Sequence, residues 1–436
     1  MRKVIFAIPC RNNPLAGSHV LTDFTMLSTG SFFRFWILLF FLAALAISCS
    51  KEPASPEYKF FVSKEVAAQW TKEYMGGLVD AVSGTYPEAA QIKPLITDDV
   101  TVYKIVYKTV VNDQEINASG LVCVPMNEGS YPVLSFQNGT NTVNDYAPSM
   151  LPSDFSYQMI ELIASTGYIV LLADYPGFGE SASIPHPYLV KEPTVRSLVD
   201  MLYAVRELTE KGLPGIKQLN EYYLLGYSQG GWATLALHKA LELDYSSDFN
   251  LKGSACGAGP YDIFLLMEEM LNETTYPMPV YLGYIGYAYV AYNQFTNPLT
   301  DIFNVPYAGR ISTLYNGLLT SSEINDQLTT SIPDLINPAF LEGFATAPEY
   351  ASVRNALENN SVHGWLSYKP LLLLHGADDT SVNPVSTENL YSEMISAGTS
   401  PGLCSKVIIP GADHSTGIVP AMMQGILFLN DLRTSR

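Results

Sequence analysis

The sequence predicts an α/β fold with a mostly parallel central sheet, helices on both faces and one large helical insertion. Short apolar runs alternate with helical patterns between residues 132 and 257, and the alternation resumes at residue 370. Between them, residues 259–364 lack this alternation and are rich in Tyr, Leu and proline breakers. A structureless loop of that length is uncommon in a compact domain, so we expect an inserted helical subdomain there.

Each expected element follows from a local pattern of apolar and turn-forming residues. Two strands joined by a turn at Asn112-Asp113 open the fold as a hairpin, and alternating strands and helices follow. The expected strands are residues 101–110, 116–125, 132–137, 169–173, 222–225, 252–257, 370–374 and 406–410. The expected helices are residues 153–166, 192–211 and 385–397 and a last helix from residue 417.

Length and composition fit one large domain with an insertion, or two modest domains. The chain has 436 residues, of which 47% are apolar, and a net charge of −18. Four basic residues and one acidic residue precede Cys49, so the remainder carries a net charge of −21. A surface this acidic repels nucleic acid and anionic lipid, and neither is an expected partner.

The N-terminal region has the pattern of a targeting segment. Residues 35–47 form an apolar run that is short for a bilayer span but suits the core of a signal peptide. Ser48-Cys49 follows at once and resembles the lipobox of bacterial lipoproteins, although Ala46 stands where Leu is commoner. A start at Met26 would give a signal peptide of ordinary length. We expect lipidation of Cys49 and export to a bacterial cell envelope, at the periplasm or the cell surface; a plain secretory signal or an uncleaved anchor is the alternative.

These patterns divide the chain into five segments. They are a targeting segment (1–49), a polar linker (50–63), the first part of the core (64–258), the helical insertion (259–365) and the second part of the core (366–436).

The cysteines do not indicate a disulfide framework or a metal site. Cys123 and Cys256 lie in apolar, strand-like surroundings, and the third cysteine after the linker, Cys404, leaves an odd number. Buried core thiols are therefore expected. No C-x-x-C or H-E-x-x-H motif occurs, so we expect no structural metal, and no cofactor is implied.

Residues 222–237, YYLLGYSQGGWATLAL, contain the strongest chemical motif. A short apolar strand runs into a helical pattern, and Ser228 sits on the turn between Gly226 and Gly230. Glycines without Cβ atoms let strand and helix approach while the serine adopts a strained, exposed conformation. The pattern G-x-S-x-G in this context predicts a nucleophilic serine.

A nucleophilic serine needs a histidine base and an acid that orients the base. In this strand–turn–helix type of site the acid and the histidine follow the serine in chain order. His414 follows the last strand, and Asp379 follows the strand before it, so these two are the predicted partners. Asp378 is expected to cap its loop, and Asp262 is a distant alternative to Asp379.

The other histidines fit the base role less well. His19 lies in the targeting segment, and His363 belongs to the insertion. His186 precedes the serine, and His238 follows it by two helical turns. His375 is expected to brace the turn in which it lies.

An oxyanion needs backbone donors near the serine. One expected donor is the N–H of Gln229, directly after the nucleophile, and the other is the N–H of Thr140, in the loop after the strand 132–137.

From about residue 100 to 436 the chain resembles the α/β-hydrolase superfamily, and within it the secretory lipase family. The resemblance rests on Asn138-Gly139-Thr140 with residues 144–149, the turn 226–231, the loop Asp174–Gly179 of type D-x-x-G-x-G, and the large insertion after Gly259-Pro260. It implies hydrolysis of lipid-like or acyl esters, with the insertion as a cap over the acyl site. Asn138 departs from the His that often precedes Gly in this superfamily.

The expected function is a serine carboxylesterase or lipase acting on a small-molecule acyl ester or lipid. An aminopeptidase or amidase with the same residues is the alternative, for which Glu268 and Glu269 would be candidates to bind an amine. A non-catalytic binding lipoprotein is a third reading. Five tyrosines of the insertion offer an aromatic wall for the substrate, although packing against the core is the commoner use of such a stripe. They are Tyr281, Tyr284, Tyr287, Tyr289 and Tyr292.

Overall fold

A computed structural model describes residues 58–435. The expected signal peptide, the lipidation of Cys49, the choice of start codon and most of the linker lie outside the described residues. Within residues 58–435 no helix combines the length and the apolar character that crossing a bilayer requires.

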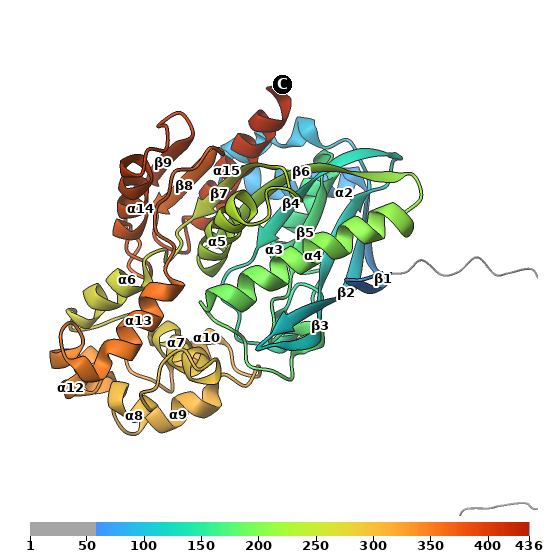
Figure 1. Ribbon diagram of the computed structural model, residues 1–436. Coiled ribbons are helices and arrows are strands. Elements are labelled where there is room, and N and C mark those ends of the chain that lie inside the picture. Colours follow the sequence, from blue (N-terminus) through green and yellow to red (C-terminus); the bar gives the residue numbers. More distant parts are fainter. Residues whose placement is uncertain (1–57, 436) are drawn as a thin grey trace, which may run out of the picture. The chain divides into compact units, whose positions relative to one another are not determined.

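The described chain is built on a nine-stranded sheet with the order β1-β2-β3-β5-β4-β6-β7-β8-β9 (Figure 1). β1, β2, β3 and β5 pair antiparallel in turn, and every pairing from β5 through β9 is parallel. The strands are β1 (Phe61–Trp70), β2 (Val100–Val111), β3 (Gln114–Pro125), β4 (Gly129–Gln137), β5 (Ile169–Ala173), β6 (Ile216–Tyr227), β7 (Leu251–Gly257), β8 (Leu371–Gly376) and β9 (Cys404–Ile409). The predicted fold class is confirmed.

The antiparallel end of the sheet contains one strand that the sequence pattern did not predict. Asn112 and Asp113 adopt φ angles of 49° and 59°, as the two-residue turn between β2 and β3 requires. β1 pairs with β2 at the outer edge and begins at Phe61, before the expected start of the fold near Lys64. Most of its side chains are exposed, so it lacks the alternation that identifies a half-buried strand.

Helices cover both faces of the sheet, because successive side chains along a strand contact apolar clusters on opposite faces. In β5, Ile169, Leu171 and Ala173 face one apolar cluster, whereas Val170 and Leu172 face the other. Helices α4, α5 and α14 pack on the first face, and α2 and α15 pack on the second (Figure 1). These core helices are α2 (Lys72–Ser83), α3 (Phe155–Glu161), α4 (Lys191–Lys211), α5 (Gln229–Leu243), α14 (Val385–Ser396) and α15 (Ile418–Thr434).

Between β7 and β8 the chain forms helices and adds no strand to the sheet, and these helices appear in yellow and orange in Figure 1. We call residues 258–370 the helical insertion. Its helices are α6 (Ile263–Leu271), α7 (Pro279–Ala291), α8 (Leu299–Ile302), α9 (Tyr307–Leu314), α10 (Ser321–Asn325), α11 (Ile332–Leu335), α12 (Pro338–Gly343) and α13 (Ala351–Asn360). Short 3-10 segments are η1 (Pro87–Gln91), η2 (Lys93–Leu95), η3 (Asn144–Tyr146), η4 (Leu162–Thr166), η5 (Gly179–Ser181) and η6 (Pro348–Tyr350).

Cys123, Cys256 and Cys404 are buried thiols, and no disulfide joins them. Each lies on a strand of the sheet, in the apolar surroundings that the sequence indicated.

Glu161 is an acidic residue in the apolar layer on the face of the sheet that α2 and α15 cover. Its side chain is 0% exposed, and Oε2 accepts a hydrogen bond of 2.6 Å from the Trp70 indole N–H. Oε1 is buried without a hydrogen-bond partner among residues 58–435. Burial raises the pKa of Glu161 to about 7, against the opposing effect of the Trp70 hydrogen bond.

Replacing Glu161 by Gln should therefore stabilise the protein in a pH-dependent way. Because the folded-state pKa is raised, ionising Glu161 costs stability progressively as pH rises from about 4.5 to about 7. Glu161→Gln should gain roughly 3 kcal/mol of unfolding free energy at pH 8 relative to pH 4. Urea unfolding of both proteins at the two pH values measures this difference, and an equal effect at both would show that Glu161 does not titrate in this range.

Candidate active site

Ser228 lies on the turn between β6 and α5, with φ 60° and ψ −126°. Its backbone N–H donates to the carbonyl of Gly257 at the end of β7, with an N–O distance of 2.9 Å. A side chain at Gly226 would collide with the carbonyl oxygen of Gly230, and one at Gly230 would collide with that of Gln137. Helix and strand therefore pack so closely that only glycine fits at both positions, as the G-x-S-x-G pattern predicts.

His414 lies in the loop between β9 and α15 and faces Ser228. Its Nε2 atom is 2.9 Å from Ser228 Oγ, and its Nδ1 atom is 2.6 Å from Asp379 Oδ2. The Tyr227 hydroxyl donates to the His414 carbonyl, and the Asp413 side chain accepts hydrogen bonds from the two backbone N–H groups that follow His414. The loop is thus fixed on both sides of the imidazole.

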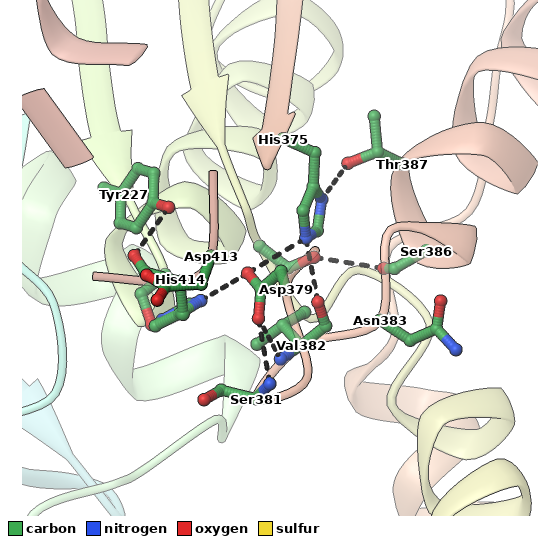
Figure 2. Close-up of polar contacts among 12 residues, drawn as sticks. Tyr227, His375, Asp379, Ser381, Val382, Asn383, Ser386, Thr387, Asp413 and His414 are labelled. Carbon is green, nitrogen blue, oxygen red and sulfur yellow. Dashed lines mark hydrogen bonds and ion pairs between the residues drawn. The ribbon is translucent and has the colours of Figure 1, made fainter. Parts of the chain in front are cut away.

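Asp379 follows β8 and is buried at the centre of the polar contacts in Figure 2. Its Oδ1 atom accepts the backbone N–H groups of Ser381 and Val382, both at 2.9 Å. Its Oδ2 atom lies 3.3 Å from His375 Nε2 in addition to the contact with His414. Burial alone would raise the pKa of Asp379, but the hydrogen bonds from His375, His414 and Val382 hold it well below its ordinary value. Asp379 is therefore ionised at neutral pH.

His375 braces this turn from the end of β8. It is fully buried, its Nδ1 atom lies 2.7 Å from the Thr387 hydroxyl oxygen, and its Nε2–H group donates to the Val382 carbonyl at 2.9 Å. The Nε2 atom also lies 3.3 Å from Asp379 Oδ2, so His375 contacts both the turn and the acid. The sequence indicated the bracing role but not the direct contact with Asp379.

The two alternative acids lie elsewhere. Asp378 is exposed, and its neighbour Asp379 is the one that contacts His414. Asp262 is the N-cap of α6, where its side chain accepts the N–H of Leu265. The structure therefore brings together Ser228, His414 and Asp379 of the predicted residues.

The predicted oxyanion donors lie on either side of the serine. Gln229 is the first residue of α5, where backbone N–H groups have no partner within the helix. Thr140 belongs to a loop that runs beside the serine, since a Cβ built on Gly139 would lie 3.8 Å from Ser228 Cβ. The role of the Thr140 N–H group stays a prediction.

His186, set aside from the sequence because it precedes the serine, contacts the side chain of the residue that follows Ser228. Its ring is buried, Nδ1 lies 2.8 Å from the Pro176 carbonyl oxygen, and Nε2 lies 2.8 Å from the Gln229 side-chain amide. Burial lowers the pKa of His186 to about 4, so the ring is neutral and accepts from Gln229 while donating to Pro176. Chain order excludes His186 as the base, but it does not exclude this positioning contact.

Two cavities meet at Ser228. The first, of about 890 Å³, lies under the insertion and is bordered by Gln229 and Asp379; we call it the insertion cavity. The second, of about 770 Å³, is bordered by His414 and Thr140; we call it the apolar cavity.

The insertion cavity is lined by apolar residues of α6 and α7 and by four carboxylates. Its acidic residues are Glu269, Glu273, Asp378 and Asp379. No Lys or Arg lines this cavity in the described part of the chain.

The tyrosine stripe of the insertion serves two purposes. The hydroxyls of Tyr284, Tyr289 and Tyr292 donate to backbone carbonyls of core loops, at residues 141, 189 and 185. Tyr287 stacks on Tyr315 within the insertion. Tyr281 alone of the five borders both cavities at Ser228. Four of the five tyrosines therefore serve packing, and only Tyr281 contributes an aromatic wall beside Ser228.

Asp262, His363 and Glu393 form the one group among residues 58–435 whose ligand atoms lie within 4.8 Å of one another. His363 Nδ1 lies 3.6 Å from Glu393 Oε1, and the Lys239 ammonium donates to the His363 backbone carbonyl. The absence of a structural metal stays a prediction.

A model of the alpha/beta hydrolase family matches residues 144–423. The chain belongs to the alpha/beta hydrolase family. The predicted superfamily is thereby confirmed, and the D-x-x-G-x-G loop and the serine turn both lie within the matched range.

Solved structures of the same fold cover most of the chain. A Legionella pneumophila protein with a provisional assignment as a hydrolase matches with a TM-score of 0.77 and 24% identity, over 87% of this chain and 99% of that one. The rice cell wall degrading esterase LipA from Xanthomonas oryzae matches with a TM-score of 0.73 and 21% identity, over 87% and 100%. Candida antarctica lipase A in its closed state matches with a TM-score of 0.61 and 13% identity, over 85% and 81%. No curated protein sequence matches significantly.

The close approach at the serine turn predicts that Gly226 cannot be enlarged. Gly226→Ala should lower the free energy of unfolding by about 1–3 kcal/mol, because the added methyl meets the Gly230 carbonyl and the Thr234 side chain. Gly77→Ala is the matched control: Gly77 lies within α2 with open space around it, and this change should stabilise by about 0.5–1 kcal/mol. Urea unfolding of the two variants measures the change in unfolding free energy. Equal changes in the two variants would contradict a steric role for Gly226.

Proposed function

We propose that this protein is a serine hydrolase that cleaves carboxylic esters through an acyl-enzyme on Ser228. The observation that carries the proposal is the continuous set of contacts from Asp379 through His414 to Ser228 Oγ, at 2.6 and 2.9 Å. The low pKa of Asp379 supports the role of orienting acid, because its charge stabilises the imidazolium that forms during catalysis.

The first half of the reaction forms the acyl-enzyme. His414 Nε2 takes the proton of Ser228 Oγ as that oxygen attacks the ester carbonyl carbon. The carbonyl oxygen gains negative charge and accepts the N–H groups of Gln229 and Thr140. The bond from carbon to the alcohol oxygen then breaks, and His414 gives its proton to the departing alcohol.

The second half releases the acid. A water molecule gives a proton to His414 Nε2 while its oxygen attacks the acyl carbon, and the bond to Ser228 Oγ breaks. The proton returns to Ser228, so the enzyme is restored and the products are one alcohol and one carboxylic acid. The esterase and lipase among the structural neighbours are consistent with this chemistry, although at their level of identity they show the fold alone.

An amidase or aminopeptidase is the second candidate, and one observation favours it. Glu269 and Glu273 line the insertion cavity together with Ser228, whereas Glu268 does not. Burial and the neighbouring acids Asp262, Glu268 and Glu273 raise the pKa of Glu269, and a cationic amine beside it would offset that repulsion. Such an arrangement would favour an acyl group that carries an amine.

Ser228→Ala should abolish ester hydrolysis. The wild-type protein and the variant are compared on p-nitrophenyl esters from acetate to palmitate, with circular dichroism to show that both are folded. The rate of the variant should be lower than that of the wild-type protein by at least about 10³-fold, since the nucleophile is lost. If the folded wild-type protein cleaves no ester, the ester proposal is wrong, and aminoacyl p-nitroanilides test the second candidate.

Asp379→Asn should lower kcat by about 10³–10⁴-fold with little change in KM, because His414 loses the partner that fixes its tautomer. Asp378→Asn is the matched control and should retain kcat within a few-fold, since Asp378 makes no contact with His414. Steady-state kinetics on the same p-nitrophenyl ester separates them. A large loss with Asp378→Asn and a small one with Asp379→Asn would reverse the assignment of the acid.

A further inference from the structure

We propose that the alcohol half of the ester is a bulky apolar group that occupies the apolar cavity, while the acyl half occupies the insertion cavity. This assignment rests on the proposed ester hydrolysis and adds the class of substrate to it. Its basis is the position of His414 relative to the two cavities.

The direction of the ester follows from where the proton must go. His414 Nε2 takes the proton from Ser228 and must deliver it to the departing alcohol oxygen, which therefore lies beside the imidazole. His414 borders the apolar cavity and does not border the insertion cavity. The alcohol thus leaves through the apolar cavity, and the acyl group extends past Gln229 into the insertion cavity.

The apolar cavity is suited to a large hydrocarbon group. Apart from Tyr281, its walls come from the core, chiefly the loop after β4, the segment 146–160 and the first half of α15. Apart from His414, the charged residue that lines it is Asp154, whose carboxylate caps α3 by accepting the N–H of Ser156. Its apolar lining residues are Val82, Phe136, Leu151, Phe155, Met159, Ile160, Ile418, Val419, Met422, Met423 and Ile426.

The mouth of the apolar cavity exposes large apolar side chains to water. Tyr146 is 50% exposed, Phe155 49%, Ile418 42% and Leu151 38%. They come from two segments far apart in the sequence and border the same cavity. Such a concentration of exposed apolar groups around a cavity indicates an apolar ligand rather than a structural need.

The insertion cavity differs in charge. Glu269, Glu273 and Asp378 line it, and no basic residue balances them within the described chain. An acyl group with a free carboxylate is therefore disfavoured there. Tyr281 borders both cavities, and its side chain carries a hydroxyl. It can donate to the ester at the point where the two halves of the substrate meet.

The first test compares alcohols of equal reactivity. Ethyl butyrate and 2-cyclohexylethyl butyrate have the same acyl group and leaving groups of similar acidity, so a difference in kcat/KM reports binding of the alcohol. Acid release by the full-length protein is followed by pH-stat. The bulky ester should be favoured by more than about 10-fold, the least that one well-buried hydrocarbon increment supplies.

The second test alters the two cavities separately by substitution. Ile418→Asp puts a carboxylate at the mouth of the apolar cavity, at the first residue of α15, where a negative charge suits the helix terminus. It should reduce the preference for the bulky alcohol by about 10-fold and leave the ratio of octanoate to acetate ethyl esters within about 2-fold. Met270→Trp narrows the insertion cavity and should do the reverse. Leu318→Asp, on an exposed residue that borders neither cavity, should change neither ratio.

The outcomes separate the inference from the proposed function. A preference for the bulky alcohol that Ile418→Asp removes and Met270→Trp spares supports the assignment. An active esterase without that preference, or one in which the two variants exchange their effects, overturns the assignment but not the ester chemistry. A folded protein that hydrolyses neither butyrate overturns the proposed function, and the assignment falls with it. Leu151→Asp, in a loop of the same mouth, replaces Ile418→Asp if that variant does not fold.

Discussion

The packing of the first turn of α5 onto the carboxyl ends of three strands is the constraint on which the site depends. Gly226 on β6 faces Gly230, Gly230 faces the end of β4, and Gly231 faces the Gly257 carbonyl at the end of β7. No side chain fits at these contacts, so the helix terminus lies directly against the sheet. This close approach holds Ser228 at positive φ and fixes the helix N–H groups beside its hydroxyl.

Two buried histidines hold the groups around that turn. His186 connects a core carbonyl to the Gln229 side chain, and His375 connects the Val382 carbonyl and Thr387 to Asp379. Each uses both ring nitrogens, so neither ring can rotate without breaking a buried contact. The site thus has one buried support beside Gln229 and another beside Asp379, and His414 is the histidine that contacts Ser228.

The sequence was sufficient for the fold and for the three central residues because those depend on local pattern and chain order. The alternation of strands and helices predicts the parallel sheet, and parallel strands bring their carboxyl ends to one edge, where Ser228, Asp379 and His414 all fall. The strand β1 was missed because its side chains are mostly exposed. The contacts of His186 with Gln229 and of His375 with Asp379 were missed because they depend on how loops fold over the sheet. The presence of two cavities at Ser228 has no sequence signal at all, since the cavities are formed by surfaces of segments more than a hundred residues apart.

The helical insertion leaves the sheet after β7 and returns at β8, and these two strands are neighbours. Its ends are therefore close together, and its length and sequence can change without altering any strand pairing. The apolar cavity takes only Tyr281 from the insertion, whereas the insertion cavity takes much of its wall from α6 and α7. In the scheme proposed above, acyl selectivity and alcohol selectivity are carried by separately replaceable parts of the chain. Exchange of residues 258–370 between relatives would then alter the acyl selectivity and leave the alcohol selectivity unchanged. The fold could thus acquire new substrates by changing one segment.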